Sequence, residues 1–442
     1  MKQLNVLVIG DPFARSGGGS RCLEVVSRYK EHGISPILVI PPFNNEAFRM
    51  ARFLPALVAN GVKIIGAELA HFYAQKKKAY ARTSLLGYAA SSLLVSRFSN
   101  EIARILRNVK IDFVMGQHEL WDVIQATHQI AEKLGVSSAI VLQAPPFYQN
   151  SYKLFELDML DSLSISQLSG KYPLFGHYAF LSPPLSRRVA SILYAEMIEF
   201  AGETTRSAYY KSTSGRHLDS IDRVLAVSKS IPFEMGDGWI EKVTVLEPSV
   251  AVDQEWGEND CVETEKGDYV LYFTRLVPSK GVLEVPFIWK AFLKNSDRKL
   301  KLYVVGAFED KRVEEAFEFL ISKLGLENNV KCLGYYKGKQ LIDIVAKARA
   351  VIYPSHSDSV SLVVLECLAL GTPIIAYDIP AIRFNYYATE GVEIVPEFDV
   401  VAMGHGLSRL IEDRGALGRL RLPTWDKVAE GEANLIRAGL LY

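Results

Sequence analysis

The chain has 442 residues, too many for one ordinary hydrophobic core, which predicts two domains. Hydrophobic residues make up 49% and charged residues 23%, proportions that exclude a disordered or fibrous protein. Lys and Arg together number 50, as do Asp and Glu, so the overall charge gives no reason to expect a nucleic-acid partner. The first 220 residues are net basic and the rest net acidic. This asymmetry is either chance or a field that steers anionic partners.

The cysteines and the N-terminus indicate where the chain works. The four cysteines are scattered, without the spacing of a metal site, and this favours a reducing compartment. The opening run LNVLVIG is too short for the core of a signal peptide and is typical of a buried strand. No stretch reaches the roughly 20 apolar residues of a membrane span. We therefore expect a cytoplasmic location.

Short runs rich in Val, Ile and Leu alternate with helix-length segments along the first half. Such runs predict strands buried on both faces of a parallel sheet, and the alternation predicts a doubly wound α/β domain. The Tyr- and Leu-rich segment near 147–220 is either an elaboration that faces a substrate or a pair of packing helices. The predicted strands are 4–9, 36–40, 63–66, 112–116, 138–143 and 223–228.

The same alternation restarts after an acidic, glycine-containing segment, 251–269, which we interpret as a linker. The resulting domains are 1–250 and 251–425, with a final helix at 426–442. Two such domains would leave a cleft lined by the carboxyl ends of strands, where ligands of these sheets usually bind. The second set of predicted strands is 269–274, 300–305, 330–333, 350–354, 373–377 and 392–395, with helices around 312–324 and 340–347.

The first candidate motif is the loop after the first strand. Gly17, Gly18 and Gly19 come just before a helical pattern. Glycines there let backbone N–H groups approach a phosphate or a sugar at a helix N-terminus. The spacing matches neither a dinucleotide-binding fingerprint nor a P-loop, so a plain flexible turn is the alternative.

The second motif is RLVPSKG, in which Arg275 and Lys280 flank a short turn at the end of a predicted strand. Arg binds oxygens as a fork and Lys binds as a point charge, so the pair can clamp a diphosphate. A solvated basic turn is the alternative.

The third motif, PSHSDSVSLVVLECLALGTPII, places a Ser- and Asp-rich loop before an apolar helix. Backbone amides of Val360, Ser361, Leu362 and Val363 can hold a diphosphate at the helix N-terminus. Glu366 lies inside the apolar helix, where a carboxylate needs a partner. A ribose diol would supply two hydroxyl donors, and a neighbouring Lys or Arg is the alternative.

Together these segments resemble the retaining glycosyltransferases of family 4, which have the GT-B fold of two Rossmann-like domains facing a central cleft. The resemblance implies that Arg275 and Lys280 bind the donor diphosphate, that Glu366 binds its ribose, and that Asp358 contacts the transferred sugar. It makes 1–250 the acceptor side and 251–425 the donor side. The resemblance covers nearly the whole donor half and, more loosely, the first strand, loop and helix.

Three further segments extend the resemblance. VKCLGYY, with Gly334 and Tyr335, is similar to the segment that packs near the nucleobase. LPTWDKVAE resembles the helix that crosses back to the N-terminal domain. His118 is the nearest match to a family histidine at a strand end, either contacting substrate or serving as a polar loop residue, whereas Gln143 stands where a second histidine is usual.

The chain also departs from the family pattern. Asp358 replaces a glutamate, and Ser359 and Ser361 replace two glycines. These changes leave the donor sugar open. They favour, as an alternative, a non-catalytic subunit that binds nucleotide-sugar, and a nucleotide-sugar epimerase or hydrolase is a third possibility on this fold.

The resemblance implies a mechanism that requires no metal and no cofactor beyond a nucleotide-diphosphate-sugar co-substrate. The developing charge would be stabilised by Arg275, Lys280 and helix N-terminal amides. The sequence leaves the acceptor open, with a glycan and a lipid-linked acceptor as the two candidates. A basic and then apolar segment, 76–107, predicts either peripheral contact with an anionic membrane or an ordinary buried helix with a basic end.

Overall fold

The computed structural model describes residues 3–10, 17–40, 54–66, 68–69, 72–73, 85–147, 213–257, 265–412, 420 and 422–439. These residues form two compact units. The first contains the described residues up to Ala251 together with those from Pro423 onward, and the second contains those within 252–422. Most of the predicted elaboration near 147–220 lies outside the described residues, so it stays a prediction. None of the described helices has the length and apolar character needed to cross a bilayer.

The first unit is built on a parallel sheet of seven strands in the order β3-β2-β1-β4-β5-β6-β7. Strands β1 and β2 pair along their whole length, from Leu4 opposite Ile34 to Ile9 opposite Val39. Strand β7 was not predicted, because the exposed Thr244 at its centre interrupts the apolar run. The strands are β1 (Leu4–Ile9), β2 (Ile34–Val39), β3 (Lys63–Ile65), β4 (Phe113–Gly116), β5 (Ser138–Leu142), β6 (Arg223–Ala226) and β7 (Val243–Val245).

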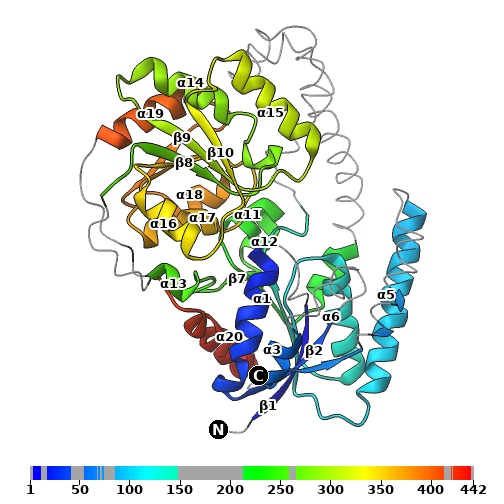
Figure 1. The fold of residues 1–442 in the computed structure, drawn as a ribbon. Coiled ribbons are helices and arrows are strands. Elements are labelled where there is room, and N and C mark those ends of the chain that lie inside the picture. The colour runs from blue at the N-terminus through cyan, green and yellow to red at the C-terminus, as the bar shows by residue number, and fades with distance from the viewer. Residues whose placement is uncertain are drawn as a thin grey trace. The chain divides into compact units, whose positions relative to one another are not determined.

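Helices join these strands, as expected for parallel pairing. The last described helix of the chain, α20, lies beside α1 in this unit (Figure 1). The predicted return of the C-terminal helix is therefore confirmed. The helical elements are α1 (Gly17–Arg28), η1 (Tyr29–His32), α3 (Leu54–Ala59), α5 (Leu85–Ile105), α6 (Trp121–Leu134), α11 (Ser230–Met235), α12 (Asp237–Ile240) and α20 (Trp425–Gly439).

A buried polar network fixes α20 to the first unit. Arg21 on α1 forms an ion pair with Glu432 on α20, and each is only 1% exposed. The second oxygen of Glu432 accepts hydrogen bonds from the hydroxyl of Tyr29 at 2.6 Å and from the amide of Gln117 at 2.7 Å. Arg21 also donates to the carbonyl of Ser249 at 2.7 Å. Both charges are thus paired and hydrogen-bonded, as buried charges must be.

Helix α5 contains the described part of the segment that predicted membrane contact. One face of it is buried, including Val95, Phe98 and Ile102, and it packs on α6. The side chain of Gln125 on α6 donates to Ser96 at 2.9 Å across this seam. Packing inside the unit therefore accounts for the buried apolar residues of α5, whereas Leu93 and Ile105 on the same helix are 66% and 47% exposed. The basic residues Lys76, Lys77, Lys78 and Arg82 lie outside the described residues.

The second unit holds a parallel sheet of six strands in the order β10-β9-β8-β11-β12-β13. Helices α14 and α19 pack together on one face, and α16, α17 and α18 lie on the other (Figure 1). The strands are β8 (Tyr269–Phe273), β9 (Lys301–Val305), β10 (Val330–Gly334), β11 (Val351–Tyr353), β12 (Ile374–Tyr377) and β13 (Val392–Val395). The helices are α13 (Gln254–Gly257), η3 (Pro278–Lys280), α14 (Val285–Asn295), α15 (Lys311–Lys323), α16 (Lys339–Lys347), α17 (Leu362–Ala369), α18 (Pro380–Tyr386) and α19 (Val400–Glu412).

The strand order of the second unit places a binding position at its centre. The chain runs from β8 outward through β9 to β10, and then returns to add β11 on the other side of β8. The loops after β8 and β11 therefore diverge at the carboxyl edge of the sheet. Such a switch in strand order is where doubly wound sheets bind ligands.

Candidate functional site

The turn after β8 and the loop after β11 touch through backbone. Gly281 follows η3 with φ of 72°, in the left-handed region. A Cβ atom at this position would lie 2.1 Å from the carbonyl oxygen of Pro354. Only glycine tolerates both the dihedral angle and this close approach. The glycine of RLVPSKG is thus required to bring two predicted motifs together.

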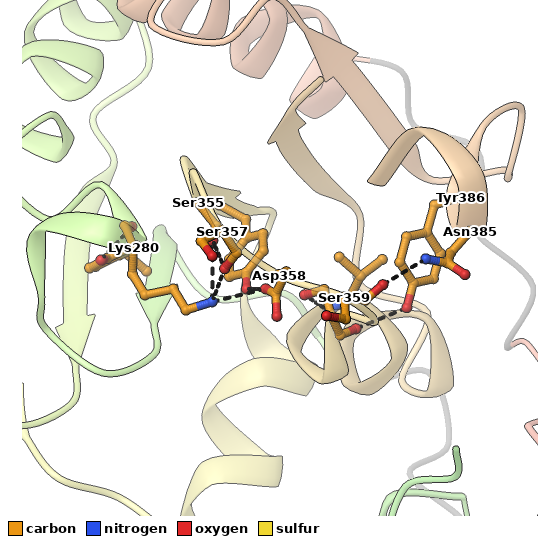
Figure 2. A network of polar contacts seen from close by, with 11 residues as sticks. Lys280, Ser355, Ser357, Asp358, Ser359, Asn385 and Tyr386 are labelled. Atoms are coloured by element: carbon orange, nitrogen blue, oxygen red, sulfur yellow. Dashed lines mark hydrogen bonds and ion pairs between the residues drawn. The ribbon is translucent and has the colours of Figure 1, made fainter. Parts of the chain in front are cut away.

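Lys280 and Asp358 meet at this contact (Figure 2). The ammonium nitrogen of Lys280 lies 3.0 Å from Oδ2 of Asp358 and 2.7 Å from the carbonyl oxygen of Ser357. It also lies 3.3 Å from the hydroxyl of Ser355. Lys280 is only 8% exposed, so its charge is held in place rather than solvated. The structure therefore brings together two residues for which the sequence analysis predicts different ligands, the diphosphate for Lys280 and the transferred sugar for Asp358.

Tyr353, at the end of β11, is a member of this cluster that sequence reasoning missed. Its hydroxyl donates to the same Oδ2 of Asp358. Burial, and then the negative charge of Asp358, raise the pKa of Tyr353 well above its ordinary value. Tyr353 therefore stays a neutral donor that fixes the carboxylate. A tyrosine at the end of a buried strand, five residues before an acid, was the available signal.

Helix α18 supports the loop that follows Asp358. The amide of Asn385 donates to the carbonyl of Ser359 at 3.0 Å, and the hydroxyl of Tyr386 donates to the carbonyl of Ser361 at 2.9 Å (Figure 2). The hydroxyl of Ser361 accepts the N–H of Val364 and caps α17. Ser361 thus has a local structural role at a position where the resembled family has glycine. The first amides of α17, those of Leu362 and Val363, point out of the helix N-terminus.

Arg275 is placed differently from Lys280. Its side chain is 58% exposed, and its guanidinium lies 3.4 Å from Oε1 of Glu309 in the loop after β9. An exposed pair of this kind is weak and readily exchanged for a ligand. Gly334 and Tyr335 end β10, where Gly334 has φ of 75° and the ring of Tyr335 is 71% exposed.

Glu366 lies half-buried in α17. Removal of water around it, and then the nearby charge of Asp253, raise its pKa to about 8. None of the described residues forms a hydrogen bond or an ion pair with its carboxylate. The alternative of a Lys or Arg partner is thus not found in the part of the chain that the structure describes. A desolvated carboxyl without a partner is a common feature of binding sites.

The remaining predicted residues lie in the first unit. Gly17, Gly18 and Gly19 form the first turn of α1 rather than the loop before it. His118 is 9% exposed and its Nδ1 lies 3.1 Å from Oε2 of Glu119. Burial alone would raise the pKa of Glu119, but His118 and backbone N–H donors lower it.

Two further features bear on the chemistry. His356, in the Asp358 loop, contacts two glutamates that the sequence did not single out. Across the described ranges, no three His, Cys, Asp or Glu side chains are grouped so that they could hold a metal ion.

Comparison with known proteins agrees with this geometry. Residues 258–421 match the family model of the group 1 glycosyl transferases. The chain is 27% identical over 145 residues to alpha-D-kanosaminyltransferase of Streptomyces kanamyceticus, covering 33% of this chain and 36% of that protein. It is 27% identical over 186 residues to D-inositol 3-phosphate glycosyltransferase of Acidothermus cellulolyticus, covering 39% and 42%. The chain thus spans less than half the length of these two curated relatives, and the matches support the group 1 family.

Solved structures resemble the whole chain. A glycosyltransferase from Rickettsia africae superposes with a TM-score of 0.60 at 14% identity, covering 100% of this chain and 94% of that one. HepE of Anabaena, in complex with UDP and glucose, gives 0.53 at 12% identity and covers 99% and 98%. At this identity the likeness concerns the fold, which is GT-B with two Rossmann-like units, as predicted.

Proposed function

We propose that the protein is a glycosyltransferase that moves a sugar from a nucleotide-diphosphate-sugar to an acceptor with retention of anomeric configuration. The observation that carries this proposal is the Lys280–Asp358 pair at the switch point of the second sheet. The same unit holds the desolvated carboxyl of Glu366, for which none of the described residues is a hydrogen-bond partner. A cation, an acid for sugar hydroxyls and an acid for ribose lie within one unit.

The donor diphosphate would bind between Lys280, Arg275 and the first amides of α17. Lys280 is already held at the carboxyl edge of the sheet, so little entropy is lost when it meets a phosphate. Arg275 is exposed and can turn from Glu309 to the ligand. The helix N-terminus adds oriented N–H dipoles. These groups replace the charge that a divalent ion would supply, so we propose binding without metal.

Glu366 would accept hydrogen bonds from the two ribose hydroxyls. Its carboxylate has been removed from much of the solvent without gaining a donor among the residues that the structure describes. Two hydroxyl donors would favour the ionised form and lower its pKa. Gly334 ends the edge strand β10 and the exposed Tyr335 directly follows it, where a nucleobase would lie.

Transfer with retention would proceed on one face of the sugar. The bond between the anomeric carbon and the leaving diphosphate breaks, and the acceptor oxygen forms its bond to the same carbon from the same face. A departing phosphate oxygen takes the proton of the acceptor hydroxyl. The protein stabilises the charge that develops on that oxygen, which is the role of Lys280 and Arg275. Asp358 would accept hydrogen bonds from sugar hydroxyls and orient the ring. His118 would contact substrate from the first unit.

Calorimetry with UDP and GDP tests donor binding. UDP is the first choice because HepE, a neighbour in fold, binds UDP. We expect binding that persists in EDTA and that weakens by several kcal/mol in the Arg275→Ala, Lys280→Ala double variant, since a charge-assisted contact contributes about 1.5–3 kcal/mol. Arg349→Ala is the matched control, because Arg349 pairs with Asp268 in the exposed loop before β8. Loss of binding in EDTA, or no effect of the double variant, would refute the proposal.

Turnover separates an enzyme from a non-catalytic binding subunit. The protein is incubated with a panel of nucleotide sugars, with and without a membrane lipid extract, and released nucleotide diphosphate is measured. Acceptor-dependent release indicates a transferase, release without acceptor indicates a hydrolase, and binding without release indicates a regulatory subunit.

Peripheral membrane contact through 76–107 is proposed separately. It is checked by co-sedimentation with anionic vesicles, which should decrease with salt.

A further inference from the structure

A histidine two residues before Asp358 joins three segments of the second unit. The backbone N–H of His356 donates to the carbonyl of Ser279 at 3.0 Å, in the turn that carries Lys280. Its Nε2 lies 2.5 Å from Oε1 of Glu284, just before α14. Its Nδ1 lies 2.5 Å from Oε1 of Glu397, just after β13. Only 13% of the imidazole side chain is exposed, so these contacts are sheltered from water.

An unusual backbone conformation holds the ring in place. Phe398 has φ of 64°, in the left-handed region that disfavours residues with a side chain. Its ring stacks on His356, with centroids 4.6 Å apart and an interplanar angle of 23°. Such conformations persist only where the surrounding structure imposes them, and they cluster at functional sites. Each glutamate contacts His356 through its Oε1. Among the described residues, no hydrogen-bond partner is found for the buried Oε2 of either glutamate.

Each contact between the imidazole and a glutamate needs a proton, because a ring nitrogen and a carboxylate oxygen do not hydrogen-bond without one. For both ring nitrogens to form hydrogen bonds, the Glu397–His356 contact must keep a proton, either on the ring or on the carboxyl group. Burial raises the pKa of Glu397 to about 9, so this proton is retained at neutral pH. A single metal ion cannot explain the arrangement, because the glutamates contact opposite nitrogens of the ring.

We propose that His356, clamped by Glu284, Glu397 and Phe398, is a positioning residue that sets the loop at 354–361 so that Asp358 and the Ser357 carbonyl meet Lys280. The role in donor binding rests on the proposed function. The loop itself is fixed by contacts that exist without ligand, so the two parts are tested separately.

Hydrogen exchange of the ligand-free protein tests the loop. We expect His356→Ala to raise amide exchange across 354–361 and 279–281 by about tenfold or more, with no change in α19. His405→Ala is the matched control, since His405 is an exposed histidine on α19. Glu397→Gln keeps a neutral partner for Nδ1 and should behave like the wild type, whereas Glu397→Leu should behave like His356→Ala. If His356→Ala does not fold, the Glu397 pair decides the question.

Calorimetry with UDP tests the link to binding. We expect His356→Ala and Glu397→Leu to weaken UDP binding about tenfold or more, with Glu397→Gln and His405→Ala within about twofold of the wild type. Unchanged loop exchange would overturn the proposal. Faster loop exchange with unchanged UDP affinity would also overturn it, because His356 would then be merely structural. If the wild type itself does not bind UDP, the proposed function fails, and exchange alone decides whether His356 positions the loop.

Discussion

The ammonium of Lys280 and the hydroxyl of Tyr353 both bind one oxygen of Asp358, its Oδ2. No described residue forms a hydrogen bond with the other oxygen, Oδ1. The carboxylate is therefore oriented by two fixed donors on one side, with its second oxygen left for a ligand. The same contact neutralises part of the charge that Lys280 would offer to a diphosphate.

This arrangement predicts opposite effects of Asp358→Asn on binding and on turnover. Free UDP should bind as well as in the wild type or up to about tenfold more tightly, because Lys280 loses its competing anion. Turnover should decrease by about 10²-fold, about 2.7 kcal/mol, because the sugar is no longer held by a charged acceptor. Calorimetry and initial rates measure the two effects, with Asp268→Asn, which removes an exposed ion pair, as the control. Loss of UDP binding would show that Asp358 contacts the nucleotide instead.

Glu366 predicts a pH dependence of stability. Its pKa is about 8 in the folded protein against an ordinary value of 4.5, so between these values the folded state holds a proton that the unfolded state lacks. The protonated carboxyl of Glu366 therefore contributes fully to the free energy of unfolding below pH 4.5. This contribution is lost as the pH rises through about 8.

Urea unfolding of Glu366→Gln and of the wild type measures this effect. We expect the stability of the variant to decrease less with pH across this window, and UDP affinity to decrease because the amide is a poorer acceptor for ribose hydroxyls. Glu390→Gln, an exposed substitution, serves as the control. The prediction would be contradicted if the free energy of unfolding changed with pH by the same amount in Glu366→Gln and in the wild type.

Two glycines with similar dihedral angles predict a matched comparison. Gly281 and Gly325 have φ of 72° and 63°, but an added Cβ meets the Pro354 carbonyl oxygen at 2.1 Å only at Gly281. At Gly325 nothing lies within 4 Å. Gly325→Ala should cost about 1–2 kcal/mol for the left-handed conformation alone. Gly281→Ala should cost more and also abolish UDP binding, as thermal melts and calorimetry would show. Equal costs would mean that the contact is not rigid.

The buried network of α20 predicts a large effect of one substitution on the stability of the first unit. Glu432→Leu leaves the guanidinium of Arg21 buried without its counter-charge, a change that costs about 3–5 kcal/mol in comparable pairs. Glu430→Gln, in an exposed pair with Lys427, should leave stability nearly unchanged. Denaturant unfolding measures both variants. A small cost for Glu432→Leu would indicate that water enters the site and solvates Arg21.

Much of the fold could be predicted because the central strands of both sheets are buried on both faces, as in β5 and β8. Continuous apolar runs end at polar loops, so most predicted strand limits agree with the structure within one or two residues, as for β8 (Tyr269–Phe273). Strand β7 gives no such signal, because the exposed Thr244 at its centre interrupts the apolar run. Gly17 to Gly19 were predicted as a loop because glycine disfavours helices, yet the structure places them in the first turn of α1.

Many residues of the candidate site could be predicted from the sequence, but the contacts between them could not. Lys280 and Asp358 are separated by 78 residues, and they meet only because β8 and β11 are neighbours in the sheet. The role of Ser361 as a helix cap also depends on local geometry. His356 gave no signal, because its glutamate partners come from two other loops and follow no motif.

The packing of α20 on α1 has a consequence for how the protein is made. The first unit needs the Arg21–Glu432 pair, whose members are separated by 411 residues. During synthesis, strands β1 to β7 of the first unit therefore leave the ribosome long before α20 has been made. The second unit is synthesised between them and α20. We expect a fragment ending at residue 251 to aggregate when expressed alone. The same fragment joined by a short linker to 423–439 should give a folded product.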